Sequence, residues 1–361
     1  MFAPTRYLEW ARRFYGAVRI DLASSGIPVI PVVELGTPDA SAFDDISGWP
    51  RLREAIGRHH DLPGSEAVAA LGTTHALWLA YASLTSPGDD VVVEWPAYEP
   101  LVRIAEGVGA RVVHFDRPEA EGWAVDPDRV ARAMTPRTRA VVVSNLHNPT
   151  GARIPDDVLR ALAAVCMARG AYLVVDEVYA PFDGLVDEAG VFRGSARRLA
   201  PGVVAVSSLT KCYGVAYQRV GWLLGPPEVV SRAQDAVTAS CGILPLEHAH
   251  VAMHALGRVG HLAQRARGML AGKRDLVARW VAKEGLSWHA PAEGLFGLVR
   301  VPGAGDLTAT IESAAQEREV LVGAGSFFGV PDGFRVAWSA PAEKLEEGLG
   351  RLADALRAVR R

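Results

Sequence analysis

The sequence has 361 residues, of which 49% are hydrophobic and 22% charged, with a formal net charge of −3 at pH 7. This length allows a large core and predicts two domains, or one large domain with a smaller one. The nearly balanced charge, without a basic block or an acidic tail, argues against nucleic acid and favours a small-molecule partner. No apolar run is long enough to cross a membrane.

The cysteines point to a reducing compartment. Cys166, Cys212 and Cys241 are far apart and form no C-x-x-C pair, so neither disulfides nor a cysteine metal site are expected. The first residues carry several arginines in a helical pattern and lack the apolar core of a signal peptide. We therefore expect a cytoplasmic protein.

The N-terminal part predicts a helix over 7–15 followed by irregular chain. The sequence Asp21-Leu-Ala-Ser-Ser-Gly26 leads into the Pro-rich residues 27–38, which are not expected to be regular helix. A helix is expected to begin near Gly48, because Pro50 suits a first turn.

Residues 71–84 predict a turn that opens a helix. Gly72, Thr73 and Thr74 precede an apolar-periodic run that ends at Leu84. Such a turn presents backbone N–H groups and two hydroxyls to an anion at the positive end of the helix dipole. Simple N-capping by one threonine is the alternative interpretation.

Three apolar strands, at 91–93, 140–144 and 171–175, each lead into polar residues. Continuous apolar runs of this kind are typical of parallel strands buried on both faces, whose carboxyl ends line a ligand crevice. The polar residues that follow include Tyr98, Asn148, Asp176 and Tyr179. A buried carboxylate such as Asp176 needs a cation or N–H donors, and a helix cap or an arginine partner is the alternative to a ligand. Tyr98 could also be a core or loop tyrosine, and the Asn148 segment an ordinary turn.

The strand predicted at 203–206 leads into the residues with the clearest chemistry, Ser208, Lys211 and Arg219. Lys211 is either a surface side chain or a desolvated amine able to form a Schiff base. Because two phosphate-type ligands flank the lysine, we favour the second interpretation.

Helices are expected at 228–238 and 247–276. His248, His250 and His254 lie on the second, but the chain has no H-E-x-x-H motif, so we expect no metal site. The remaining residues predict a smaller α/β unit, with strands at 319–322 and 334–338.

Two motifs suggest other enzymes. Gly323-Ala-Gly325-Ser-Phe-Phe-Gly329 follows a strand, but its third glycine comes one position late for a dinucleotide loop, so a nicotinamide enzyme is not expected. Residues 208–211 fit the S-x-x-K of penicillin-binding serine hydrolases, but S-D-N and K-T-G are absent.

Taken together, Ser208-Leu-Thr-Lys211, Tyr213-Gly214 and Arg219-Val-Gly-Trp222 resemble the cofactor-lysine segment of class I/II aminotransferases. These are fold type I enzymes that carry pyridoxal 5'-phosphate. The resemblance implies an α/β fold with a large cofactor-binding domain, residues 46–245, built on a mostly parallel seven-stranded sheet between helices. A smaller α/β domain is implied for residues 1–45 and 246–361.

The resemblance also implies roles for single residues. Lys211 carries the cofactor as a Schiff base and moves the substrate proton, while Asp176 pairs with the ring nitrogen and Tyr98 stacks on the ring. The residues implied to bind the phosphate are Gly72, Thr73, Thr74, Ser208 and Arg219. Those implied to bind the phenolic oxygen are Asn148 and Tyr179. Those implied to bind substrate are Gly26, Asn148 and Arg335, with an ordinary turn glycine and an exposed-strand arginine as the alternatives for Gly26 and Arg335.

One position departs from the family pattern. Phe43 stands where many members have a tyrosine that touches the phosphate of the neighbouring subunit, which leaves that contact open. A homodimer is implied by the family.

The implied reaction is amino transfer between an L-amino acid and a 2-oxo acid. A lyase or cyclase that catalyses β- or γ-elimination or cyclisation is the alternative, because these reactions share formation of a carbanion. Residues 7–10 and 21–26 resemble capreomycidine synthase, an arginine-derived cyclase of the same family. Aminotransferase-like domains also occur in regulators behind a DNA-binding module, but no room for such a module precedes Gly48.

Overall fold

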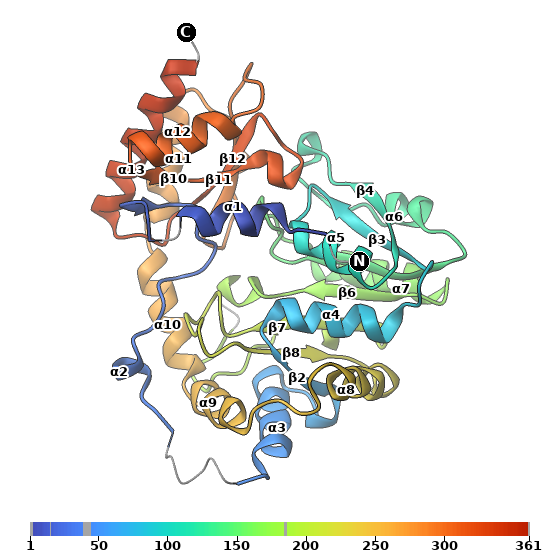
Figure 1. Ribbon diagram of the computed structural model, residues 1–361. Helices are drawn as coiled ribbons and strands as arrows, with labels where there is room; N and C mark the ends of the chain where they lie inside the picture. The colour runs from blue at the N-terminus through green and yellow to red at the C-terminus, as the bar shows by residue number, and fades with distance from the viewer. Residues whose placement is uncertain (1–2, 15, 39–44, 184–185, 360–361) are drawn as a thin grey trace.

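The structure of the protein is a computed structural model that describes residues 3–14, 16–38, 45–183 and 186–359. Phe43, where the sequence departs from the family pattern, lies outside the described residues. Three sheets and the helices that pack on them form the architecture in Figure 1.

The largest sheet has seven strands in the order β2-β8-β7-β6-β5-β3-β4. β8 pairs antiparallel with β2 and β7, whereas the other neighbouring strands are parallel. The prediction of a mostly parallel sheet is therefore confirmed. The strands are β2 (Ala67–Leu71), β3 (Asp90–Trp95), β4 (Arg111–Asp116), β5 (Thr138–Ser144), β6 (Tyr172–Asp176), β7 (Val203–Ser208) and β8 (Val220–Leu224).

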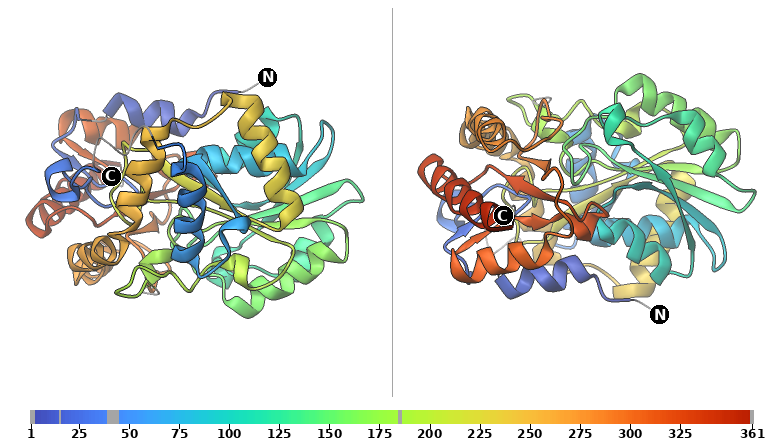
Figure 2. Two further views of the ribbon diagram at one scale, coloured as in Figure 1. Left: turned by 90° about the horizontal axis from the view of Figure 1, so that it is seen from below. Right: turned by 90° about the horizontal axis from the view of Figure 1, so that it is seen from above.

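Helices cover both faces of this sheet (Figure 2). Ala140 and Val142 of β5 pack in one hydrophobic core with α4, α5 and α8, whereas Val141 and Val143 pack with α7 on the other face. Burial on both faces explains why the strand is a continuous apolar run. The helices around the sheet are α3 (Gly48–His60), α4 (Thr73–Leu84), α5 (Glu99–Gly107), α6 (Pro127–Ala133), α7 (Asp156–Met167), α8 (Pro227–Cys241) and α9 (Leu246–Leu256).

The two ends of the chain meet in a hydrophobic core of their own. β1 (Ile20–Asp21) pairs parallel with β10 (Val320–Leu321), and a separate antiparallel sheet has the order β11-β12-β9. Figure 1 shows α1 beside the C-terminal elements. The elements of this part are α1 (Arg6–Phe14), α11 (Lys273–Lys283), β9 (Phe296–Arg300), α12 (Thr308–Glu317), β11 (Gly323–Ala324), β12 (Gly333–Ala337) and α13 (Ala342–Val359).

Two helix predictions were wrong in detail. The Pro-rich stretch contains one helical turn, α2 (Val32–Leu35), which Gly36 closes by donating its N–H to the Val32 carbonyl at 2.7 Å. Pro31 precedes this turn, where its missing N–H is not needed. The long helix expected at 247–276 is interrupted after α9 and after α10 (Val259–Leu270), and Gly272 at the second break has a φ of 72°.

Residues 21–27 form an N-terminal strap that connects the small sheets to the loop around Lys211. Leu22 donates its N–H to the Leu321 carbonyl at 2.8 Å, and Ile27 donates to the Lys211 carbonyl at 3.1 Å. The strap therefore holds residues near the N-terminus at the carboxyl ends of the parallel strands.

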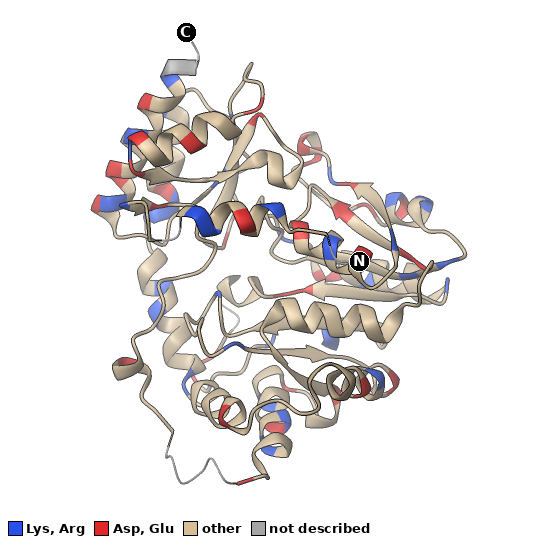
Figure 3. Cartoon of the chain, viewed as in Figure 1, with Lys and Arg blue, Asp and Glu red and all other residues tan. Residues whose placement is uncertain are grey.

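Charged residues of both signs lie mainly on helices and loops (Figure 3). Along α13, for example, Arg351 pairs with Glu347 at 2.8 Å. In the described part of the chain, no helix combines the length and the apolar composition that a membrane span requires.

β8 lies close to the turn before α4, and this contact predicts that a larger side chain there lowers stability. A Cβ added at Gly221 would lie 2.6 Å from the backbone of Gly72. We expect Gly221→Ala to lower the free energy of unfolding by about 2 kcal/mol, because overpacking forces the backbone to shift. Urea unfolding measures this loss.

Gly268→Ala is the matched control, because a Cβ at this position on α10 would meet nothing within 4 Å. It should leave stability unchanged or raise it by up to about 1 kcal/mol. An equal change in the free energy of unfolding for both variants would contradict the steric argument.

Candidate active site

A cavity of about 450 Å³ lies at the carboxyl ends of the parallel strands. It brings together eight of the residues singled out in the sequence, namely Thr73, Thr74, Tyr98, Asp176, Tyr179, Ser208, Lys211 and Arg219. A larger cavity of about 670 Å³ lies against α3 and α9 and contains none of them. The smaller cavity is therefore the candidate site.

One end of the cavity is suited to an anion. The hydroxyls of Thr73, at the start of α4, and of Thr210 are buried and have no hydrogen-bond partner among the residues that the structure describes. A Cβ at Gly72 would collide with the Arg219 guanidinium, so only glycine lets the arginine lie across this turn. Unpaired hydroxyls, a helix N-terminus and a guanidinium together make a cradle for a phosphate. The hydroxyl of Ser208 accepts the N–H of Thr210 at 3.3 Å.

Lys211 points its amine into the cavity. Its Nζ donates a hydrogen bond to Oγ of Ser25 at 3.1 Å. Burial, together with the positive charges of Arg335 and Arg219, lowers the pKa of Lys211 to about 8, while Asp176 opposes the change. At pH 7 roughly a tenth of this amine is therefore unprotonated and nucleophilic, far more than for an ordinary lysine.

Asp176 ends β6 and is 3% exposed. Its Oδ1 accepts the N–H of Val178 at 3.1 Å. Burial raises the pKa of Asp176 to about 7, and the nearby Glu94 adds to this rise, although the Val178 N–H and Lys211 oppose it. A cation bound beside this carboxylate would keep it ionised.

Arg335 on β12 is fully buried behind the cavity. Its Nη1 donates to Oδ1 of Asn148 at 2.7 Å, and its Nη2 donates to the Tyr7 hydroxyl at 2.5 Å and the Ala23 carbonyl at 2.8 Å. The rings of Tyr7, Phe296 and Phe328 surround the guanidinium at 5.0 to 5.4 Å. The surface-strand alternative for Arg335 is therefore wrong. Within the described part of the chain, Nε of Arg335 and Nδ2 of Asn148 have no hydrogen-bond partner.

Comparison with known proteins identifies the family. Residues 34–352 match the family described as aminotransferase class I and II. The chain belongs to this family. It is an aminotransferase that depends on pyridoxal phosphate, and the fold type I prediction is confirmed.

Two curated relatives show how far the similarity extends. The aspartate/prephenate aminotransferase of Thermus thermophilus is 32% identical over 86% of this chain and 82% of its own length. Capreomycidine synthase of Streptomyces vinaceus is 31% identical over 96% of this chain and 92% of its own length. Among solved structures, a double mutant of Thermus thermophilus aspartate aminotransferase has a TM-score of 0.80 and 27% identity, covering 97% of this chain and 94% of that one.

The cavity of this aminotransferase fits its cofactor. The unpaired hydroxyls of Thr73 and Thr210 suit the phosphate, and the buried Asp176 suits a protonated ring nitrogen. The Nδ2 of Asn148 is a donor for which the described residues supply no acceptor. No group of three or more metal-type ligands occurs among the described residues.

Gly72 and Gly26 flank this aminotransferase's cavity. Gly72 is the N-cap of α4, with a φ of 83°, and Gly26 packs beside the Lys211 side chain. Tyr98 precedes α5, and burial raises the pKa values of both Tyr98 and Tyr179.

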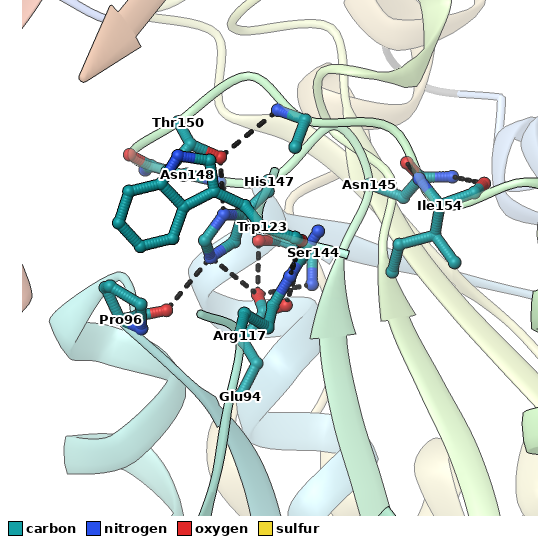
Figure 4. Close-up of polar contacts among 11 residues, drawn as sticks. Glu94, Pro96, Arg117, Trp123, Ser144, Asn145, His147, Asn148, Thr150 and Ile154 are labelled. Atoms are coloured by element: carbon teal, nitrogen blue, oxygen red, sulfur yellow. Dashed lines mark hydrogen bonds and ion pairs between the residues drawn. The ribbon is translucent and has the colours of Figure 1, made fainter. Parts of the chain in front are cut away.

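A buried polar network supports Asn148 from below (Figure 4). Glu94 accepts hydrogen bonds from the Ser144 N–H at 2.7 Å and from Arg117 Nη1 at 2.6 Å. The Ser144 hydroxyl accepts the N–H of Asn148 at 3.1 Å, and His147 bonds the Pro96 carbonyl at 2.9 Å. An ion pair buried this deeply fixes the turn that carries Asn148.

Sequence reasoning missed several residues of the site. Thr210 had a usable signal, because a second hydroxyl directly precedes the lysine. Ser25, Tyr7 and the pair of Glu94 with Arg117 had none, since their partners are distant in sequence.

The raised pKa of Asp176 predicts a pH-dependent stability of the cofactor-free protein. The pKa in the folded state lies above the value of 3.8 for an unperturbed Asp, so the folded protein binds the extra proton and loses stability as pH rises towards 7. Asp176→Asn removes this loss. Relative to wild type, the variant should gain on the order of 2 to 3 kcal/mol between pH 5 and pH 8.

Asp235→Asn, at an exposed position on α8, is the control and should show no such gain. Urea midpoints at both pH values measure the effect. A pH-independent difference between wild type and Asp176→Asn would contradict the account of this carboxylate.

Proposed function

We propose that this cavity catalyses amino transfer between an L-amino acid and a 2-oxo acid, with Lys211 as the cofactor lysine. The observation that supports this most is the Lys211 amine, whose pKa is lowered to about 8 and which points into the cavity between Asp176 and the anion cradle. When bound, pyridoxal phosphate supplies an electron-withdrawing ring that stabilises negative charge at the substrate α carbon.

The cradle would hold the phosphate. Thr73, Thr74 and Gly72 offer hydroxyls and a helix N-terminus, and Ser208, Thr210 and Arg219 approach from the opposite side. Fixing the phosphate orients the rest of the cofactor relative to Lys211.

The other residues would hold the ring. Asp176 would pair with the ring nitrogen, Tyr98 would pack on the ring face, and Asn148 and Tyr179 would donate to the phenolic oxygen. The network around Glu94 keeps the Asn148 backbone in place through Ser144. These groups stay in one geometry while protons move.

Lys211 would act as base and acid. Its unprotonated Nζ would take the proton from the substrate α carbon, and the resulting ammonium would hold this proton and give it up again later in the reaction. Arg335 binds the substrate carboxylate through its guanidinium, with Gly26 leaving room for the substrate beside the strap. The rings around Arg335 exclude water from that contact.

A lyase or cyclase is the second candidate function. It is favoured by the similarity to capreomycidine synthase, which covers 96% of this chain and so extends further than the similarity to the aspartate/prephenate enzyme. Among the described residues that line the cavity, Asp176 is the only acidic one. If Asp176 pairs with the ring, no carboxylate of these residues remains for a guanidinium side chain, which argues against a substrate such as arginine.

We also propose that residues 46–245 form the cofactor-binding domain, and residues 1–45 and 246–361 the small domain. The seven-stranded sheet lies within the first range and the other two sheets within the second, while α9, at the start of the second range, packs on the seven-stranded sheet. A homodimer is supported by membership of the aminotransferase family. Three free cysteines support a cytoplasmic protein.

The function is tested by mixing the cofactor-loaded protein with single L-amino acids and recording absorbance spectra. We expect at least one amino acid to convert the cofactor to its amine form and to yield the matching 2-oxo acid. Lys211→Ala should lose this activity by roughly 10³-fold or more, because its base and nucleophile are gone. Lys344→Ala, at an exposed position on α13, is the control.

If the protein instead yields products of elimination or cyclisation and no amine form of the cofactor, it is a lyase or cyclase and not an aminotransferase. Full activity of Lys211→Ala would contradict the assignment of Lys211.

A further inference from the structure

The strap places a buried hydroxyl against the Lys211 amine. Ser25 is 9% exposed, and its Oγ accepts the hydrogen bond from Lys211 Nζ at 3.1 Å. The Ser25 side chain also hydrogen-bonds with the Tyr179 side chain. One hydroxyl thus connects an amine and a phenol that come from different parts of the chain.

The strap is fixed before Ser25, where the Ala23 carbonyl accepts a hydrogen bond from Arg335 Nη2 at 2.8 Å, and also after it. Ile27 donates its N–H to the Lys211 carbonyl at 3.1 Å, and the Ser339 hydroxyl donates to the Gly26 carbonyl at 3.1 Å. A Cβ at Gly26 would lie 3.5 Å from Cδ of Lys211, so the strap packs along the lysine stem. The Ser25 hydroxyl is therefore pre-positioned by contacts that do not involve its own side chain.

The surroundings of the amine make this acceptor important. The charged and titratable groups that act on Lys211 are Arg335, Arg219, Asp176 and Cys212. The two guanidiniums repel an ammonium, and Asp176 is directed towards the ring nitrogen in the proposed function. In the described part of the chain, Ser25 is the one hydrogen-bond acceptor of the Lys211 amine.

We propose that Ser25 is a positioning residue that holds the Lys211 amine in the cavity whenever this amine is not joined to the cofactor. The inference rests on the proposed role of Lys211 as the group that moves the substrate proton. Ser25 keeps its own proton and only accepts a hydrogen bond, while Lys211 Nζ takes and returns the substrate proton. An amine that is already held in place loses less freedom when it accepts that proton.

The lysine content allows a direct test. The sequence has four lysines, Lys211, Lys273, Lys283 and Lys344. Cofactor-free protein labelled with ¹³C at the lysine ε carbon should thus give four NMR signals, and Lys211→Arg identifies that of Lys211. Ser25→Ala should lower the pH midpoint of this signal by about one pH unit, because the ammonium loses its acceptor.

Matched variants separate this effect from general disturbance. Ser24→Ala, at the exposed neighbouring position, should titrate like wild type, and Ser25→Thr, which keeps the hydroxyl, should restore the midpoint. Ser25→Cys keeps the size but accepts hydrogen bonds weakly, so it should also lower the midpoint if Ser25→Ala does not fold.

A second readout uses the cofactor-loaded enzyme and an amino acid deuterated at the α carbon. Ser25→Ala should slow conversion to the amine form roughly 10-fold to 100-fold and increase the deuterium isotope effect, with unchanged cofactor affinity. An unshifted Lys211 midpoint, or a wild-type rate and isotope effect, would overturn the proposal. The titration does not depend on the reaction, so a failure of amino transfer in wild type would be recognised separately.

Discussion

The site depends on the cost of burying three ionisable groups together. Lys211, Asp176 and Arg335 all lie in or behind one cavity, with Asp176 and Arg335 buried and Lys211 half-buried. Charges in such a place require partners, or their pKa values shift towards the neutral form. Arg335 has fixed partners in Asn148, Tyr7 and the Ala23 carbonyl. Lys211 and Asp176 have only partial ones, and their pKa values move to about 8 and about 7. Lys211 and Asp176 therefore each have room for a further partner, which a bound ligand can supply.

The fold provides this arrangement by bringing three parts of the chain together at the carboxyl ends of the parallel strands. β6 and β7 end at Asp176 and Ser208, while β12 presents Arg335 from the sheet formed near the C-terminus. The N-terminal strap crosses between them and bonds to the Lys211 loop at Ile27. Behind these ends, the buried ion pair of Glu94 and Arg117 stabilises the turn before Asn148. Lys211 and Arg335 are thus held by residues that lie far from them in the sequence.

Much of the fold and site could be predicted from sequence, because the signals are local. Continuous apolar runs predicted the buried strands, and the spacing from Ser208 to Arg219 predicted the cradle. The contacts of Ser25 with Lys211, 186 residues apart, and of Tyr7 with Arg335, 328 apart, have no local signal, since tertiary packing makes them. The division of the helix expected at 247–276 into parts of three helices was missed, because glycine alone does not fix where a helix stops.

The central claim, that Lys211 is the cofactor lysine, is tested most directly by covalent mapping. The cofactor-loaded protein is reduced with borohydride and digested, and the peptides are examined by mass spectrometry. The account predicts a single pyridoxyl group, on the peptide that contains Lys211. A pyridoxyl group on Lys273, Lys283 or Lys344 instead, or no modification of a protein that has bound the cofactor, would contradict it.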